Sequence, residues 1–316
     1  MGCDCLVKAI GYAAVTLVLS KIASHVWQIL YPYVIGAKKD LRKLAGANTA
    51  VVTGATDGIG KAYAFELAKK GFNLVLISRT QSKLDETAKE ITDKHSDVKV
   101  DTISFDFSVG DVKNYEERLF NQLDKYEIGV LVNNVGMSYE YPERLHDIDG
   151  GLARVAGITI INTLPCTLLS AYVLKKMAAR KNGVVINISS SASAKPLAYW
   201  AIYSATKKYV NWLSEIMRKE YAGKGVTIQT IAPMMVATKM SKVRKSSFFI
   251  PQASAYARAA LGTVGLADET TGYLSHQLQH DLYFNVLPDW VFNYMANQNS
   301  LATRARALKK KAQKQE

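Results

Sequence analysis

The chain has 316 residues, of which 48% are hydrophobic and 21% charged, and its formal net charge is +13. This length suits one α/β domain with short appendages, and the sequence has no internal repeat or long low-complexity stretch, which excludes solenoid and disordered classes. Three cysteines are too few for a disulfide framework, five scattered histidines lack metal-ligand spacing, and the basic residues lack interleaved aromatics, so we expect neither a metal nor a nucleic-acid partner.

The first predicted element is an apolar segment over residues 9–35, which is long enough to cross a bilayer. Lys21 interrupts it at a cost of roughly 3 kcal/mol, which snorkelling reduces. Four cations follow an aromatic belt at its end: Lys38, Lys39, Arg42 and Lys43. Because positive loops stay in the cytosol, we expect residues 1–46 to be a membrane anchor, spanning or interfacial, with the remaining chain on the cytosolic side. A cleaved signal peptide is less favoured, since no small-x-small site ends the segment.

Strand and helix patterns then alternate along the chain. The predicted strands are 48–53, 73–78, 98–105, 128–133, 184–189 and 226–231, with a seventh at 272–277. The predicted helices are 61–70, 83–94, 112–125, 151–180 and 203–223. This alternation predicts an α/β fold, a Rossmann-type doubly wound parallel sheet with helices on both faces, in a catalytic domain over residues 47–280.

The last part of the chain, residues 281–316, is predicted to contain amphipathic helix and a basic tail. The helical pattern over 282–307 is compatible with closing a pocket, extending a dimer surface or lying on a membrane. Residues 304–316 hold six Lys/Arg against one acid. That tail is either a solvated helix end or a segment attracted to an anionic membrane.

Three glycines separate the first strand of the sheet from the helix that follows it: Gly54, Gly58 and Gly60. Glycines permit a tight turn and let the backbone approach a diphosphate, which binds at the helix N-terminus. The spacing is G-x-x-x-G-x-G. Strand, glycine turn and helix together predict nucleotide binding rather than an ordinary turn.

A tyrosine and a lysine, Tyr203 and Lys207, are one helical turn apart and therefore share a helix face. The lysine charge favours the ionised phenol, so this tyrosine can exchange a proton near neutral pH. Ser190 lies thirteen residues before Tyr203, at the end of the strand predicted over 184–189. In the company of the glycine turn, these three residues predict a catalytic site.

These motifs resemble, in content and order, those of the short-chain dehydrogenase/reductases. The series comprises Thr53 to Gly60, Asn133-Asn134-Val135-Gly136, Asn162, Ser190, Tyr203 and Lys207. Finer details resemble the membrane-bound 17-beta-hydroxysteroid dehydrogenase type 3 and type 12 branch, whose members include very-long-chain 3-oxoacyl-CoA reductases. The resemblance runs from about Ala45 to the C-terminus. Val135 in place of alanine and Met234 in place of glycine depart from the wider superfamily and stay within the habits of this branch.

The resemblance implies a role for each catalytic residue. Tyr203 would give a proton to a substrate carbonyl, Lys207 would lower the Tyr203 pKa and hold the nicotinamide ribose, and Ser190 would hydrogen-bond the substrate carbonyl. Asn162 would position a water that connects Lys207 to solvent. The cofactor contacts that the resemblance implies are Gly54, Thr56, Asp57, Gly58, Ile59, Gly60, Ser78, Arg79, Asp106, Asn133, Val135, Gly136, Tyr203, Lys207, Pro233, Val236 and Thr238.

The end of the second strand indicates which cofactor is used. Enzymes that use NAD usually carry a carboxylate there, whereas this strand ends in Ser78-Arg79. The Arg79 guanidinium suits a 2′-phosphate and Ser78 adds a hydroxyl, so we expect NADP(H). Asp106 and Asn133 would lie near the adenine and its ribose, and turn formation is the alternative role for both.

The expected function is NADPH-dependent reduction of a lipid ketone at the endoplasmic reticulum membrane. A long-chain 3-oxoacyl-CoA of fatty acid elongation is favoured over a 17-beta-hydroxysteroid or sterol substrate. A steroid pocket would be lined by residues such as Phe248, Phe249 and Tyr256. A catalytically idle lipid-binding or scaffolding protein is the alternative of another class. The resemblance also implies a homo-oligomer formed through the helices predicted over 151–180 and 203–223.

Overall fold

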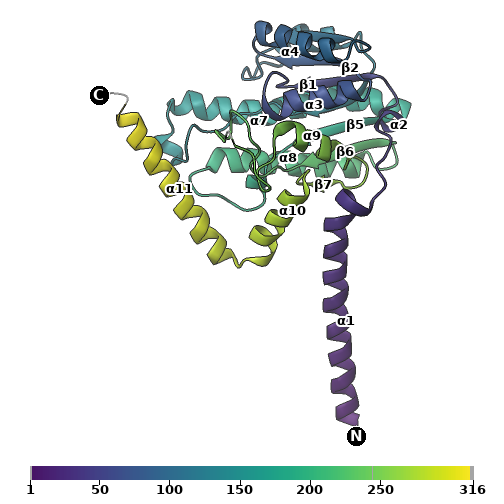
Figure 1. Cartoon of the computed structure of the whole chain (residues 1–316), viewed down its shortest axis with the longest axis vertical. Helices are drawn as coiled ribbons and strands as arrows, with labels where there is room; N and C mark the ends of the chain where they lie inside the picture. The colour runs from purple at the N-terminus through teal and green to yellow at the C-terminus, as the bar shows by residue number, and fades with distance from the viewer. Residues whose placement is uncertain (1, 244, 314–316) are drawn as a thin grey trace.

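A seven-stranded parallel sheet forms the centre of the computed structural model, which describes residues 2–243 and 245–313 (Figure 1). The strand order is β3-β2-β1-β4-β5-β6-β7. The strands are β1 (Thr49–Thr53), β2 (Asn73–Ser78), β3 (Val100–Ser104), β4 (Ile128–Asn133), β5 (Gly183–Ile188), β6 (Val226–Ile231) and β7 (Glu269–Thr270). The order reverses between β1 and β4, which confirms the predicted doubly wound fold and places a ligand site outside the carboxyl ends of the strands.

Helices cover both faces of the sheet, because successive strand residues point to opposite sides and are apolar on both. Ala50 and Val52 pack against the first group of helices, and Val51 packs against the second. The first group is α2 (Leu41–Ala45), α3 (Gly58–Lys69), α4 (Gln81–Lys94) and α9 (Ala253–Leu261). The second group is the helical stretch α5 (Val112–Tyr115), η2 (Glu116–Phe120) and α6 (Asn121–Leu123), with the long helices α7 (Gly151–Arg180) and α8 (Ala201–Glu220).

The predicted seventh strand at 272–277 is wrong. The strand β7 lies earlier, at Glu269–Thr270, and Gly272 turns the chain with a φ of 78°. Only glycine fits at this turn, because a Cβ at position 272 would lie 2.7 Å from the Tyr256 hydroxyl. The helix α10 (Leu274–His280) then begins where the strand was expected.

The predicted amphipathic helix at 282–307 is two elements. The short η5 (Asp281–Val286) continues α10, and α11 (Asp289–Ala312) starts after Leu287-Pro288. Pro288 precedes α11 and breaks the helical path, because proline lacks the N–H that a continuous helix needs. In Figure 1 the two arms form a V below the sheet.

The N-terminal helix α1 (Gly2–Leu30) projects from the body as a single rod (Figure 1). Every residue from 4 to 24 is exposed. The stretch Asp4–Ile35 is long and apolar enough to cross a membrane. Helix α7 passes the same test, but 44% of its most apolar window is buried in the body, as in the core helix of a soluble domain.

Two contacts fix the base of the N-terminal helix to the body. The His25 imidazole lies 3.5 Å from the Asp281 carboxylate. In η1 (Tyr31–Ile35), the Tyr33 hydroxyl hydrogen-bonds to Thr270 and, at 3.1 Å, to Thr271. The rod is therefore attached to β7 and to the start of η5 rather than hanging from a free linker.

Candidate active site

The glycine turn between β1 and α3 has the shape that its sequence predicts. Gly54 and Gly58 adopt positive φ values of 63° and 54°. A Cβ at Gly60 would lie 2.3 Å from the Gly54 carbonyl oxygen, so only glycine fits. Asp57 caps α3 by accepting from Gly58 N at 2.7 Å, and the half-buried Ile59 packs against the core. The glycines therefore let the backbone at the start of α3, beyond the capped Gly58 amide, approach a phosphate.

The two strands at the reversal point of the sheet are tied together by Thr53 and Asn134. The Thr53 hydroxyl accepts from Asn134 N at 2.9 Å and from Val135 N at 3.0 Å. The Asn134 amide donates back to the Thr53 carbonyl at 2.9 Å. Sequence reasoning quoted Asn134 within its motif and gave it no role. Its role here is to hold β4 against the glycine turn.

The neighbouring Asn133 side chain faces the interior. Its amide nitrogen donates to Ser170 at 3.0 Å and to Asn187 at 2.8 Å. This burial, under α7, removes the Asn133 side chain from the expected contact near an adenine ribose, so any such contact falls to its backbone. Val135 is half-buried and packs against the α7 side of the core.

The residues expected to select the cofactor meet at the ends of β1, β2 and β3. The Thr56 and Ser78 hydroxyls are 3.0 Å apart, and Arg79 is exposed beside them. Burial raises the pKa of Asp106, but hydrogen bonds from Ser108 and the positive charge of Arg79 outweigh it, so this pKa lies below the ordinary value. The sheet edge thus presents a guanidinium and two hydroxyls, a suitable set for a phosphate monoester.

Helix α8 brings the predicted catalytic residues together after the end of β5. Ser190 lies close enough to the Tyr203 phenol to act on its pKa, and its Oγ accepts from Ala192 N at 3.2 Å. Lys207 Nζ lies 5.9 Å from the centroid of the Tyr203 ring and donates to the Ile188 carbonyl at 3.0 Å. Among the three consecutive serines, the structure therefore places Ser190 at the phenol, as the thirteen-residue spacing predicted.

Burial sets the pKa values of this pair. It raises the pKa of Tyr203 above its usual value, and Ser190 acts in the opposite direction. It lowers the pKa of Lys207 to about 8. The expectation that the Lys207 charge lowers the Tyr203 pKa is not met, because desolvation of the phenol outweighs every downward effect. The phenol is consequently protonated at neutral pH and can donate its proton.

Asn162, in the middle of α7, lies against the same cluster. Its side chain accepts from Met137 N at 2.8 Å and donates to the Met137 carbonyl at 2.9 Å. A Cβ at Gly136 would lie 3.0 Å from Asn162 Oδ1 and 3.3 Å from Lys207 Nζ. Gly136 is therefore the position that lets β4, α7 and α8 approach one another.

The segment after β6 covers the glycine turn. The Pro233 carbonyl accepts from Ser191 N at 2.9 Å, and the buried Val236 accepts through its carbonyl from Ser241 at 2.7 Å. The Thr238 methyl group lies 3.3 Å from the position that a Cβ of Gly58 would take. Pro233, Val236 and Thr238 thus run from the serine segment to the start of α3, over the predicted cofactor position.

Two aromatic residues that sequence reasoning missed form a wall beside the phenol. The Tyr139 and Trp200 rings are stacked with centroids 5.6 Å apart, and Trp200 meets Tyr203 edge to face at 6.3 Å. The Tyr139 hydroxyl accepts from Ile202 N at 2.7 Å, at the start of α8. A signal did exist, since Trp200 lies three residues before Tyr203, but Tyr139 is far away in sequence.

The loop that carries Tyr139 is held from outside by α11. Arg304 Nε lies 2.7 Å from the carboxylate of Glu143, which is only 4% exposed. At the other end of α11, Lys195 Nζ lies 2.6 Å from Asp289. Helix α11 therefore closes the outer side of the aromatic wall.

Of the three residues expected to line a steroid pocket, the structure buries one and exposes two. Tyr256 is fully buried and donates to the Thr271 carbonyl at 2.7 Å, so it belongs to the core and not to a pocket. Phe248 and Phe249 are exposed, and α10 holds their loop through a hydrogen bond from Ser275 to the Phe248 carbonyl.

A hollow of about 1170 Å³ opens beside the glycine turn. It is bordered by α3, by the end of α4, by the segment after β6 and by Lys310 of α11. Its lining contains six lysines against three acids: Lys61, Lys69, Lys94, Lys239, Lys242 and Lys310, with Asp57, Glu66 and Glu90. The excess of positive charge suits an anionic ligand.

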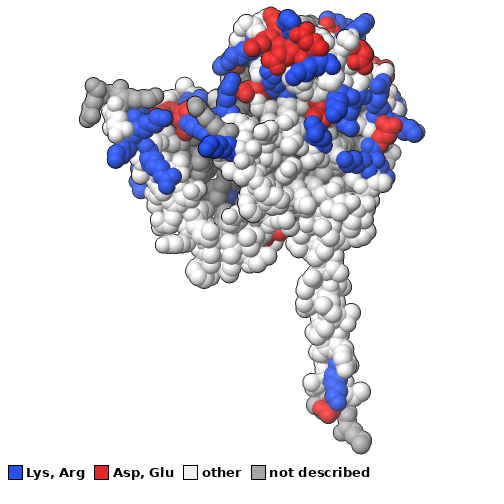
Figure 2. Space-filling model, viewed as in Figure 1, with Lys and Arg blue, Asp and Glu red and all other residues white. Residues whose placement is uncertain are grey.

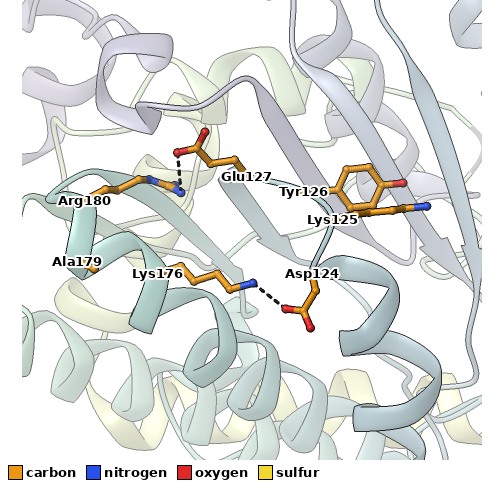
Figure 3. Close-up of a pocket in the computed structure, with 7 residues that line it drawn as sticks. All are labelled: Asp124, Lys125, Tyr126, Glu127, Lys176, Ala179 and Arg180. Atoms are coloured by element: carbon orange, nitrogen blue, oxygen red, sulfur yellow. Dashed lines mark hydrogen bonds and ion pairs between the residues drawn. The ribbon is translucent and has the colours of Figure 1, made fainter.

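A second hollow, of about 610 Å³, lies at the opposite end of the strands (Figure 3). It is formed by the residues before β4 and by the last turn of α7. Four of its charged groups are paired, Lys176 with Asp124 at 2.8 Å and Arg180 with Glu127 at 3.9 Å, and Lys125 lies over the Tyr126 ring. None of the predicted site residues lines this hollow, and its ion pairs have a structural role.

Comparison with known proteins agrees with this geometry. The sequence profile described as short chain dehydrogenase matches residues 48–247. The chain is 56% identical over 311 residues, 98% of each chain, to a very-long-chain 3-oxoacyl-CoA reductase of Caenorhabditis elegans. It is 48% identical over 305 residues, 96% of each chain, to putative steroid dehydrogenase 2 of the same organism. Among solved structures, a short-chain dehydrogenase from Sphingobium yanoikuyae in complex with NADPH is 27% identical, with a TM-score of 0.59, over 67% of this chain and 82% of its own. The chain therefore belongs to the short-chain dehydrogenase family.

Proposed function

We propose that this protein is a membrane-anchored reductase that uses NADPH to reduce the 3-oxo group of a long-chain 3-oxoacyl-CoA. The observation that carries the proposal is the half-buried Tyr203, whose phenol lies beside Ser190 and next to Lys207 at the carboxyl edge of the sheet. Similarity over 98% of the chain to a very-long-chain 3-oxoacyl-CoA reductase supports the substrate class. The enzyme would act at the endoplasmic reticulum, with residues 47–280 as its catalytic domain on the cytosolic side.

The residues present fit the cofactor. A Cβ at Gly60 would collide with the Gly54 carbonyl, so only glycine allows this close turn, and the amides of Ile59 and Gly60 at the start of α3 would bind a diphosphate. Arg79, Ser78 and Thr56 would hold the 2′-phosphate of the adenosine half. Lys207 and Thr238 would hold the nicotinamide half. Bound NADPH supplies the hydride that reduces the substrate carbonyl carbon.

The protein supplies the proton and the placement. Tyr203 is protonated at neutral pH because burial raises its pKa, and it gives this proton to the carbonyl oxygen as negative charge develops there. Ser190 donates a hydrogen bond to the same oxygen. The Lys207 ammonium stabilises the phenolate that remains, and the water that Asn162 would position carries a proton back.

The lysine-lined hollow favours an acyl-CoA over a steroid. Lys61, Lys239 and Lys242 are paired with carboxylates, and the hollow contains three further lysines. Coenzyme A is polyanionic and would be attracted to this charge, whereas a steroid ketone would not. The steroid reading remains the second candidate, because the chain is 48% identical to a putative steroid dehydrogenase over nearly its full length. In either case we propose a homo-oligomer through α7 and α8, whose surface exposes the large apolar residues Trp212 and Ile216.

An assay of the purified protein in detergent separates the candidates. We expect NADPH oxidation with a long-chain 3-oxoacyl-CoA and little with a 17-keto steroid, and the opposite result would assign the steroid function. The rate with the acyl-CoA should fall as salt rises, because salt screens the lysines from its phosphates. Activity with neither substrate, together with retained NADPH binding, would favour a catalytically idle protein.

A further inference from the structure

The turn between η5 and α11 exposes four large apolar side chains. Leu282, Val286, Trp290 and Tyr294 are 49%, 68%, 75% and 66% exposed. The opposite side of α11 packs on the body through the buried Phe292. From residue 282 to 303 the only charged side chain is Asp289. An exposed apolar surface of this kind marks a site that meets another apolar phase.

This turn and α1 lie on the same side of the molecule. In Figure 1, α10 descends from the sheet on the same side as α1 while slanting away from it, and the η5–α11 turn is the lowest part of the body. On the face shown in Figure 2, lysines and arginines gather on the upper half and over the far end of α11, while the lower half, from which α1 emerges, is nearly all uncharged. On this face the body is thus divided into a charged half and a nearly uncharged half.

The contacts at the base of α1 set the relative height of the two elements. The exposed stretch 4–24 spans about 30 Å at 1.5 Å per residue, which matches the hydrocarbon thickness of a bilayer. The next residue, His25, contacts Asp281, the first residue of η5. A bilayer that encloses residues 4–24 therefore has its surface at Asp281. The chain beyond Asp281 turns at or below that surface.

We propose that the η5–α11 turn inserts into the membrane interface beside α1 and forms a second contact with the lipid bilayer. The inference rests on the membrane anchoring proposed above. Trp290 and Tyr294 have an apolar ring with a polar group, the type of side chain that is enriched at the level of the lipid headgroups. A second copy of the chain is the competing occupant. The turn lies on the same side of the body as α1. A dimer contact does not require this position, so it favours the lipid bilayer as the occupant.

The inserted turn is connected to the active site through α11. Lys195 and Asp289 join the start of α11 to the segment between Ser190 and Trp200, and Arg304 joins its later part to Glu143. These two ion pairs thus link the proposed membrane contact to the segment that carries Ser190 and to the loop that carries Tyr139.

Tryptophan fluorescence of the full-length protein in phosphatidylcholine vesicles tests the inference. Emission is compared in vesicles with brominated and unbrominated acyl chains for the unmodified protein, Trp290→Phe and Trp27→Phe, so that each difference isolates one tryptophan. Aqueous iodide provides the complementary quencher. We expect brominated lipid to quench the Trp290 component and iodide to leave it largely intact. Trp27, near the end of α1, is the control for anchoring.

Each alternative outcome has a distinct meaning. Quenching of Trp290 by iodide and not by lipid would put the turn in water and overturn the inference. Quenching by neither would show that protein covers it, as a second copy would, and would overturn it equally. NADPH oxidation with a 3-oxoacyl-CoA is measured in the same vesicles, so either result in an active preparation leaves the proposed reaction intact. Loss of lipid quenching for Trp27 as well would overturn the anchoring itself.

Discussion

Two lysines on neighbouring long helices show how differently this fold treats a positive charge. Lys176, near the end of α7, has a side chain that is 46% exposed and pairs with Asp124, and that hydrogen bond raises its pKa. Lys207, on α8, is 5% exposed and donates to a backbone carbonyl, and burial lowers its pKa to about 8. The first environment stabilises the charge and the second opposes it. A lysine that the fold keeps in an environment that disfavours its charged form indicates a functional site.

The largest effect is expected at the phenol beside Lys207. Tyr203→Phe removes the proton donor and keeps the ring, so we expect kcat to fall by about 10²–10⁴-fold while NADPH still binds. The matched control is Tyr126→Phe at the opposite hollow, where the hydroxyl donates to Asp101. Steady-state rates and fluorescence titration with NADPH measure the two properties. Equal rates for both variants would remove Tyr203 from the reaction.

Replacing each of the two lysines by methionine tests the comparison directly. Lys207→Met should reduce kcat by about 100-fold or more, and it should also raise the melting temperature of the cofactor-free protein. A pKa lowered from 10.5 to about 8 corresponds to on the order of 3 kcal/mol that folding loses by burying this charge. Because the folded pKa is below the unfolded one, this cost is fully present below pH 8 and disappears as pH rises past 10.5. The gain in stability should therefore shrink at high pH.

Lys176→Met is the control for that experiment. It removes an exposed ion pair with Asp124, which contributes little in water, so activity should be unchanged and the melting temperature should not rise. Stabilisation by both variants would show that loss of charge in general, and not burial, explains the effect.

Arg79→Asp should weaken NADPH binding by about 10–100-fold, since it removes a charged hydrogen-bond donor and adds repulsion at the predicted 2′-phosphate position. NADH binding should change much less. Isothermal titration with both cofactors measures the ratio. Lys83→Asp, on the nearby helix α4, is the control for a general change of charge. Unchanged NADPH affinity in Arg79→Asp would contradict the assignment of this cofactor.

The smallest predicted effect concerns pH. With a pKa of about 8, Lys207 is charged below pH 8 and neutral above it. The ratio kcat/KM, which reports the free enzyme, should be level near pH 7 and fall about tenfold per unit above pH 8. A profile that stays level to pH 10 would show that the charge of Lys207 is not required.

The sequence predicted the parts of the fold that repeat a local pattern. Most of the strands were recognisable because they are apolar runs buried on both faces, although the edge strand β3 is partly exposed, and the glycine turn was recognisable because its backbone excludes side chains. Strand β7 was not, since two residues are too few to show a period. Ser190 was separable from its serine neighbours only through its distance in sequence from Tyr203.

The parts that could not be predicted depend on contacts between distant residues. The Arg304–Glu143 pair joins positions 161 apart, and the stacking of Tyr139 on Trp200 depends on how two loops meet. The sequence also failed to predict that the Tyr203 pKa is raised, because spacing along a helix shows proximity to Lys207 but not the depth of burial. For the same reason the motif position of Asn133 did not show that its side chain faces the core.

The joint at Tyr33 has a mechanical consequence. Hydrogen bonds to Thr270 and Thr271 restrain the orientation of the body relative to α1, which a flexible linker would leave free. If α1 lies in a bilayer as proposed, the fold itself then sets the orientation of the catalytic cleft relative to the membrane. Substrate molecules that diffuse in the plane of the bilayer would then always meet the same side of the body. A productive collision would no longer require the body to rotate into the right orientation.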